Sequence, residues 1–186
     1  MTRIVAGSAG GRRLKVPPKG TRPTSERVRE ALFSSLEALM DLDGVRVLDL
    51  YAGSGALGFE ALSRGAGHAT FVESDKRAAE VLKGNARELP FRDVVIANRS
   101  AEAYVAAEGE PFDVVFADPP YAVTDEELQK VLSGLVNAAR LTAGAVLIVE
   151  RASRSAEPAW PEGVESLRAK RYGDTAVYWG QVRSDG

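Results

Sequence analysis

The chain has 186 residues, with 24 lysines and arginines against 26 aspartates and glutamates, and a formal charge of −2. This length suits one domain with its own core, and the 45% hydrophobic fraction is too high for intrinsic disorder. The absence of cysteine excludes disulfides, thiolate metal centres and a cysteine nucleophile, and the single histidine, His68, argues against a Ser-His-Asp triad. The first residues lack the apolar core of a signal peptide, and the longest apolar run, 143–149, is far below a membrane span of about 20 residues. We therefore expect a soluble, cytoplasmic protein with no membrane segment.

The first 25 residues contain six basic residues and no acidic one, together with several glycines and prolines. We expect loops and short strands in this segment. Two interpretations stay open: a solvated tail, or an arm that binds phosphate groups, because lysine and arginine neutralise a nucleic-acid backbone and release its counterions. A second basic cluster, Arg168, Lys170 and Arg171, lies near the other end of the chain.

The apolar pattern predicts alternating helices and strands after this segment. Thr24 or Ser25 is expected to cap a helix that reaches about Met40. The predicted strands are 45–50, 69–73, 94–97, 112–117 and 145–150, and the predicted helices between them are 56–63, 76–88, 100–107 and 125–139. Such alternation is typical of an α/β fold whose parallel sheet is covered by helices on both faces. Residues 166–172 and 175–182 predict an appended antiparallel hairpin.

No repeat or linker divides the sequence, so we expect a single domain over residues 1–186, in which 1–40 form the basic arm plus a helix. His68 precedes a predicted strand, and we expect it at the surface or a sheet edge rather than in catalysis.

A glycine loop follows the first predicted strand of the alternating region. Asp49 stands just before it, and Gly53, Gly55 and Gly58 satisfy the pattern GxGxxG. Glu73 follows Gly53 by 20 residues, which is where an acid that binds a ribose stands in nucleotide-binding folds. A carboxylate at position 49 suits a cationic ammonium better than a pyrophosphate. The loop therefore predicts a cofactor that carries a nucleoside, with a nicotinamide dinucleotide as a competing interpretation.

A second motif, Asp118-Pro119-Pro120-Tyr121, follows the predicted strand 112–117. Each proline fixes its own φ and pushes the preceding residue into an extended conformation, so the turn is stiff. The Asp118 carboxylate and the Pro119 carbonyl then form two fixed acceptors beside an aromatic ring. This set suits a planar substrate with an amino group, because the acceptors hold its two hydrogens while Tyr121 stacks on the ring.

With these motifs the sequence resembles the class I S-adenosylmethionine-dependent methyltransferases, and among them the amino methyltransferases with (D/N/S)PP(Y/F/W). It resembles the RsmD family in particular, which comprises bacterial 16S rRNA guanine-N2 methyltransferases. The segments that carry this closer resemblance are RIVAG (3–7), GRRL (11–14), RPT (22–24), RVRE (27–30), ALGFEALSRGA (56–66) and YGDT (172–175).

The resemblance implies a Rossmann-like sheet, the cofactor S-adenosylmethionine, no metal, and a guanine in 16S rRNA of the small ribosomal subunit or of an assembly intermediate as substrate. It implies cofactor contacts from Asp49, Tyr51, Gly53, Ser54, Gly55, Glu73, Ser100 and Asp118. Asp118, Pro119, Pro120 and Tyr121 would hold the reacting base. Arg12, Arg13, Lys15, Arg22 and Arg27 would contact RNA. At position 100 the family often has an acid, whereas this chain has a serine.

Other functions remain open at this point. The same turn occurs in methyltransferases that act on adenine N6 in RNA or DNA and on glutamine N5 in protein. A nicotinamide oxidoreductase and an RNA-binding assembly factor without catalysis are the alternatives from other classes.

Overall fold

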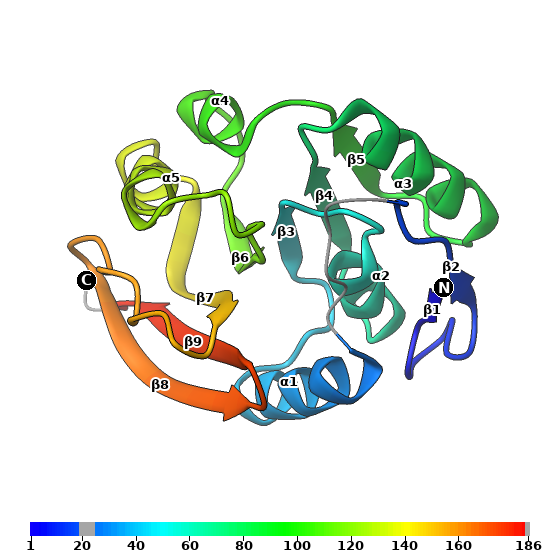
Figure 1. Cartoon of the computed structure of the whole chain (residues 1–186), viewed down its shortest axis with the longest axis horizontal. Coiled ribbons are helices and arrows are strands. Elements are labelled where there is room, and N and C mark those ends of the chain that lie inside the picture. The colour runs from blue at the N-terminus through cyan, green and yellow to red at the C-terminus, as the bar shows by residue number, and fades with distance from the viewer. Residues whose placement is uncertain (19–24, 185–186) are drawn as a thin grey trace.

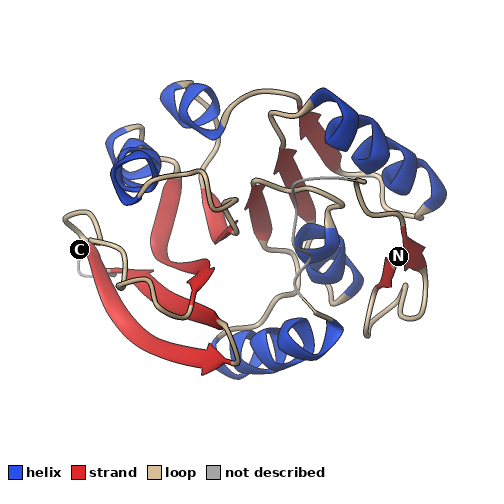
Figure 2. Ribbon diagram, in the orientation of Figure 1, coloured by secondary structure: helices blue, strands red, loops and turns tan. Residues whose placement is uncertain are grey.

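A seven-stranded sheet forms the centre of the computed structural model, which describes residues 1–18 and 25–184 (Figures 1 and 2). Its strand order is β5-β4-β3-β6-β7-β9-β8. The first five of these strands run parallel, while β9 pairs antiparallel with both β7 and β8. The strands are β3 (Arg46–Leu50), β4 (His68–Val72), β5 (Val94–Ala97), β6 (Phe112–Ala117), β7 (Leu141–Ala152), β8 (Val164–Tyr172) and β9 (Thr175–Val182). The predicted parallel sheet and C-terminal hairpin are confirmed.

In the described residues, five helices connect or precede these strands, and four of them begin at a polar residue whose side chain accepts a hydrogen bond from the first turn. Ser25 is the cap of the first helix; the alternative cap Thr24 and the predicted site residue Arg22 lie outside the described residues. The helices are α1 (Glu26–Leu39), α2 (Ala56–Ser63), α3 (Lys76–Glu88), α4 (Ala101–Ala106) and α5 (Asp125–Asn137). In the described part of the chain, no helix has both the length and the apolar character needed to cross a membrane.

The sheet separates two hydrophobic cores, because alternate side chains of a strand point to opposite faces. Val114 and Phe116 of β6 pack on the side of α1, α2 and α3, whereas Val115 packs on the side of α4 and α5. Helices therefore cover both faces, as Figure 1 shows and as the alternating pattern predicted.

The basic N-terminal segment folds against the first core. Its strands β1 (Thr2–Arg3) and β2 (Arg13–Leu14) pair in a small separate sheet. Ile4 and Leu14 are almost completely buried in the core that contains α1 and α2. The interpretation of this segment as a solvated tail is therefore wrong for its described residues, since apolar residues between the charges anchor it.

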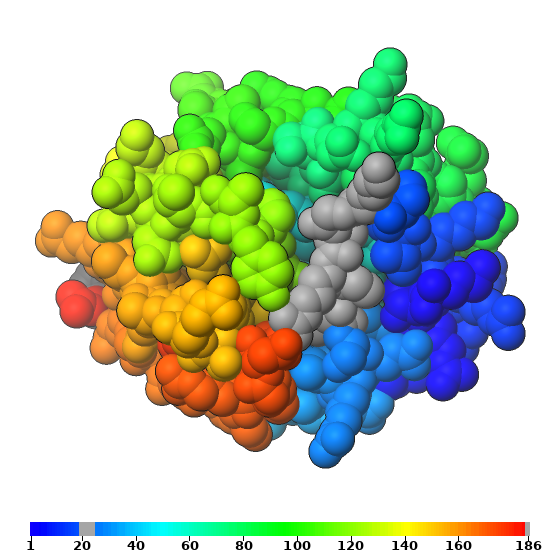
Figure 3. Space-filling view, in the orientation of Figure 1, coloured from blue at the N-terminus to red at the C-terminus, as the bar shows by residue number. Residues whose placement is uncertain are grey.

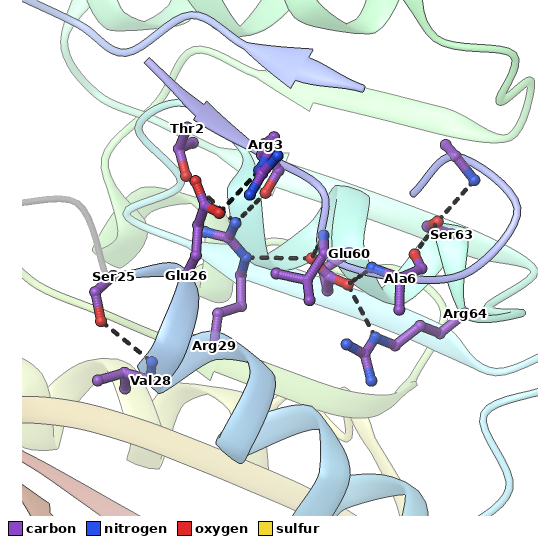
Figure 4. A network of polar contacts seen from close by, with 12 residues as sticks. Thr2, Arg3, Ala6, Ser25, Glu26, Val28, Arg29, Glu60, Ser63 and Arg64 are labelled. Atoms are coloured by element: carbon purple, nitrogen blue, oxygen red, sulfur yellow. Dashed lines mark hydrogen bonds and ion pairs between the residues drawn. The ribbon is translucent and has the colours of Figure 1, made fainter. Parts of the chain in front are cut away.

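A buried carboxylate on α2 holds the N-terminal segment and α1 together (Figure 4). One oxygen of Glu60 accepts hydrogen bonds from the backbone N–H of Val5 at 2.8 Å and from Nε of Arg29 at 3.2 Å. The other accepts from the N–H of Ala6 at 3.1 Å and from Nε of Arg64 at 2.9 Å. The side chains of Arg29 and Glu60 are fully buried, so the Arg29 charge needs a buried partner, and Glu60 provides it while it also pairs with Arg64.

The position of His68 corrects the sequence-based expectation. The residue is 5% exposed, because its strand β4 lies between β3 and β5. One ring nitrogen lies 2.7 Å from Asp93 Oδ1 and the other lies 2.6 Å from Thr70 Oγ1. His68 thus links strand ends inside the fold rather than facing solvent.

Replacing Glu60 tests the role of this network. The substitution Glu60→Gln keeps the shape but removes the charge and turns a donor NH2 toward other donors, so we expect a loss of about 3–5 kcal/mol in the free energy of unfolding. Urea denaturation followed by circular dichroism measures it. Glu37→Gln is the matched control, because Glu37 pairs with Arg64 from an exposed position and should change stability by less than about 1 kcal/mol. Equal effects of the two substitutions would contradict this role.

Candidate functional site

A cleft of about 960 Å³ lies where the carboxyl ends of β3, β4, β6 and β7 meet. In the strand order, β4 and β5 lie on one side of β3, and β6 lies on the other. The chain therefore leaves β3 and β6 toward opposite faces and opens a crevice between them, which is where open α/β sheets bind ligands. Leu50 and Ala117 are direct partners across this pair of strands. As a result the glycine loop after Leu50 and the Asp118–Tyr121 turn after Ala117 start side by side.

The glycine loop needs backbone conformations that few residues tolerate. Tyr51 has φ of +58°, Gly53 of +57° and Gly55 of +85°. A Cβ on Gly55 would lie 2.5 Å from the Phe59 ring, so this position excludes any side chain. The strained Tyr51 and the tight bend after it turn the backbone of the loop toward the cleft.

Gly58 serves packing rather than the turn. A Cβ at this position would lie 2.2 Å from the Phe71 ring, so only glycine lets α2 pack this closely on β4. Its backbone N–H also donates a 2.9 Å hydrogen bond to Asp49 Oδ2. The third glycine of the pattern therefore brings the helix and the acidic strand end together.

Glu73 is fixed beside the glycine loop by backbone donors. Its Oε1 accepts from the N–H of Gly53 at 2.8 Å, and its Oε2 accepts from the N–H of Asp75 at 2.9 Å. Asn98 donates to the Glu73 carbonyl at 2.8 Å and holds the backbone as well. Each carboxylate oxygen has a second lone pair, so a held Glu73 can still accept hydrogen bonds from two hydroxyl groups.

Asp49 is 1% exposed at the floor of the cleft. Burial, together with the nearby charge of Glu73, raises its pKa to about 8, although the hydrogen bond from Gly58 acts in the opposite direction. The free protein therefore holds a protonated acid here at neutral pH. A positively charged ligand in the cleft would favour the ionised form, and an anionic one would not.

The Asp118–Tyr121 turn is tied to the neighbouring strand. The N–H of Val123 donates to the Pro120 carbonyl at 3.0 Å, so the local turn uses that carbonyl and not the one of Pro119. Arg151, at the end of β7, donates to the Val123 carbonyl at 3.2 Å and to Asp125 Oδ1 at 2.9 Å. Tyr121 is 67% exposed at the edge of the cleft.

The wall of the cleft beyond this turn comes from the C-terminal part of the chain, which the sequence did not implicate. On the face shown in Figure 3, the yellow-green segment near residue 120 lies beside the golden segment near 152 and the orange segment near 174. None of these residues is among the predicted site residues, although Tyr172, Asp174 and Thr175 belong to the YGDT segment that carries the family resemblance. The pairing of β7 with β6 and β9 brings them to the cleft. They are Glu150, Arg151, Ala152, Arg154, Ser155, Tyr172, Asp174 and Thr175.

The chain matches the family model described as Conserved hypothetical protein 95 over residues 2–181. It belongs to this family, the RsmD family. It is 35% identical to the ribosomal RNA small subunit methyltransferase D of Escherichia coli K12 over 99% of this chain and 91% of that protein. It is 39% identical to the putative rRNA methyltransferase YlbH of Bacillus subtilis over 94% and 96% of the two chains. The solved structure of the putative methyltransferase yhhF from Escherichia coli has a TM-score of 0.88 at 33% identity, with 99% of each chain covered.

Most of the cofactor residues implied by the RsmD resemblance meet in this one cleft. Asp49, Tyr51, Gly53, Ser54, Glu73 and Asp118 line it, and Gly55 adjoins them at the start of α2. Ser100 is not among the described residues that line the cleft. Its hydroxyl caps α4 by accepting from the N–H of Ala103 at 3.1 Å, so the structure gives it a structural role.

The predicted RNA contacts occupy different places. Arg12 donates to the Glu88 carbonyl at the C-terminal end of α3, which favours a cation. Arg13, Lys15 and Arg27 are exposed. Lys15 precedes Val16 and Pro17, which line the cleft, so this exposed cation directly adjoins the cleft lining.

A buried amide joins this arm to the glycine loop. Asn85 of α3 accepts from the Lys15 N–H and donates to the Lys15 carbonyl, both at 2.9 Å. It also donates to the Ser54 carbonyl at 2.9 Å. No local signal predicts this bridge, because residues 15, 54 and 85 lie in three segments that are far apart in the chain.

The raised pKa of Asp49 predicts a pH-dependent stability. The unfolded chain loses this proton near pH 4, whereas the folded protein keeps it to about pH 8, so stability falls by up to about 1.4 kcal/mol per pH unit between these values. Asp49→Asn removes this contribution while keeping an acceptor for Gly58. We expect the variant to gain stability relative to the wild type as the pH rises from 5 to 8, measured by urea denaturation. A difference that stays constant over this range would contradict the prediction.

Proposed function

We propose that the protein transfers a methyl group from S-adenosylmethionine to N2 of a guanine in 16S rRNA of the small ribosomal subunit. The observation that carries this proposal is the side-by-side start of the glycine loop and the Asp118–Tyr121 turn at Leu50 and Ala117, in one cleft. Membership of the RsmD family and its similarity to rRNA methyltransferases support rRNA as the substrate class.

The cleft residues fit this cofactor. Glu73, held by two backbone amides, would accept the ribose hydroxyls. The buried Asp49 would ionise and balance the charge of a cationic ligand. The anionic pyrophosphate of a dinucleotide would instead disfavour the ionised form of Asp49. When bound, S-adenosylmethionine supplies a methyl group activated by its sulfonium. No metal is required for such a transfer, and the described residues contain no cluster of three or more acidic or histidine side chains suited to a metal ion.

The substrate turn would position the amine. Asp118 and the Pro119 carbonyl would accept the two N2 hydrogens and direct the nitrogen lone pair, while Tyr121 stacks on the base. Most of the rate enhancement would come from this positioning, with strengthening of the same hydrogen bonds as positive charge develops on the nitrogen. A base-paired guanine hides this amine, so the target base must be unpaired or turned out of its helix.

The exposed cations of the N-terminal arm would hold the RNA backbone rather than read the base. Lys15 is the best placed of those that the structure describes, since Val16 and Pro17 lead directly into the cleft. The arm with α1, residues 1–40, would then serve as the RNA-contacting part of one methyltransferase domain.

Product analysis tests this function. Small subunits and free 16S rRNA from cells that lack the protein are incubated with labelled S-adenosylmethionine, and the modified nucleoside is identified by mass spectrometry. We expect N2-methylguanosine on an assembled or assembling subunit. N6-methyladenosine, or label in protein alone, would overturn the guanine assignment.

Asp118→Ala tests the substrate turn. We expect methyl transfer to fall at least 1,000-fold, because the amine loses its positioning acceptor, while cofactor affinity stays within a few-fold. Single-turnover rates and calorimetric titration measure the two quantities. Asp41→Ala, an exposed aspartate outside the cleft, is the matched control and should keep full activity. Near-normal turnover by Asp118→Ala would refute the role of the turn.

Cofactor binding is expected to release a proton from Asp49. Because its pKa is about 8 in the free protein and a cation favours the ionised form, affinity should rise up to tenfold between pH 6 and pH 7. Calorimetry in buffers of different ionisation enthalpy measures the released proton. Asp49→Asn should abolish the release, and a pH-independent affinity of the wild type would contradict the assignment.

A further inference from the structure

Four carboxylates stand at the carboxyl ends of four neighbouring strands and line the same cleft. In sheet order they are Glu73 after β4, Asp49 in β3, Asp118 after β6 and Glu150 in β7. The function proposed above uses the first three. Glu150 is 8% exposed and has no part in it.

We propose that Glu150 accepts a hydrogen bond from N1–H of the target base and thereby selects guanine against purines without that proton. This inference rests on the proposed function and deepens it, because it concerns how the same cleft chooses its substrate.

The register of the sheet places Glu150 beside the substrate turn. Ala117 of β6 pairs with Val149 of β7, so the next residues, Asp118 just after β6 and Glu150 within β7, lie side by side at the same level. Parallel strands are about 4.8 Å apart. A base whose amine is held at Asp118 therefore has a second carboxylate one strand away along its edge.

Glu150 is also held rigidly. It pairs with Val177 of β9, so its strand is fixed between β6 and β9 rather than at a sheet edge. The following residue, Arg151, is fixed by its bonds to Val123 and Asp125. A group on such a scaffold keeps its position when a ligand enters, which is a requirement for base discrimination.

The chemistry of the purine edge matches this arrangement. Guanine presents two adjacent donors, the N2 amine and N1–H, whereas adenine and 2,6-diaminopurine present a lone pair at N1. An ionised glutamate only accepts hydrogen bonds. Where the base has a lone pair at N1, the glutamate oxygen and N1 are two buried acceptors that face each other with no proton between them. The missing hydrogen bond disfavours that base.

The decisive comparison uses a base that keeps the nucleophile. Once the modified position is mapped, small subunits are reconstituted with either guanosine or 2,6-diaminopurine riboside at that position, both of which carry the 2-amino group. For the wild type we expect kcat/KM to be roughly 10- to 100-fold lower with diaminopurine. In Glu150→Gln, whose amide offers both a donor and an acceptor, this ratio should shrink to within about threefold.

The matched control is Glu108→Gln, an exposed glutamate outside the cleft, which should keep the wild-type ratio. Unchanged cofactor affinity of Glu150→Gln, measured by calorimetry, shows that the variant is folded. Equal use of both substrates by the wild type would overturn the inference without any variant, and so would full discrimination by folded Glu150→Gln. If the wild type does not methylate guanosine at all, the proposed function itself fails, and that result is distinct from equal use of the two bases.

Discussion

The pairing of β3 with β6 is the constraint on which the cleft depends. These strands lie side by side in the sheet but are separated in the chain by two other strands, β4 and β5. The contact of Leu50 with Ala117 therefore makes neighbours of a glycine loop and a proline-braced turn that are more than 60 residues apart. The helices that follow leave toward opposite faces, so the space between the two loops stays open to a ligand.

Carboxylates determine which charge of ligand this cleft favours. Carboxylates are gathered at one edge of the sheet, and the most deeply buried of them, Asp49, has its pKa raised to about 8 because burial penalises its charge. Backbone amides stabilise Glu73, whereas Asp49 receives one such donor, from Gly58. A site of this kind costs stability in the free protein and favours a cation over an anion.

The N-terminal segment shows a limit of prediction from sequence patterns. Its basic residues suggested either a tail or an arm, and the same residues fit both. The apolar Ile4 and Leu14 and the buried Glu60 on α2 exclude the solvated tail, because they bind the segment to the main core. The strand that contains Glu150 shows a similar limit: β7 spans 141–152 rather than the predicted 145–150, since pairing with β6 and β9 extends it beyond its apolar run. His68 was misjudged because the burial of β4 depends on β5 at its far side.

The sequence by itself determined the local features: alternating helices and strands, polar caps, the positive-φ glycines and the stiff Asp118–Tyr121 turn. These features depend on backbone sterics and side-chain hydrogen bonds within a few residues. They can therefore be predicted without knowing where the segment lies in the fold. Only the tertiary structure decided which of these features meet. Strand order and register bring Glu150 and Arg151 to the substrate turn, place Asn85 between the arm and the glycine loop, and leave Ser100 outside the cleft. Contacts between separate elements depend on the packing of the whole core, and no local pattern records them.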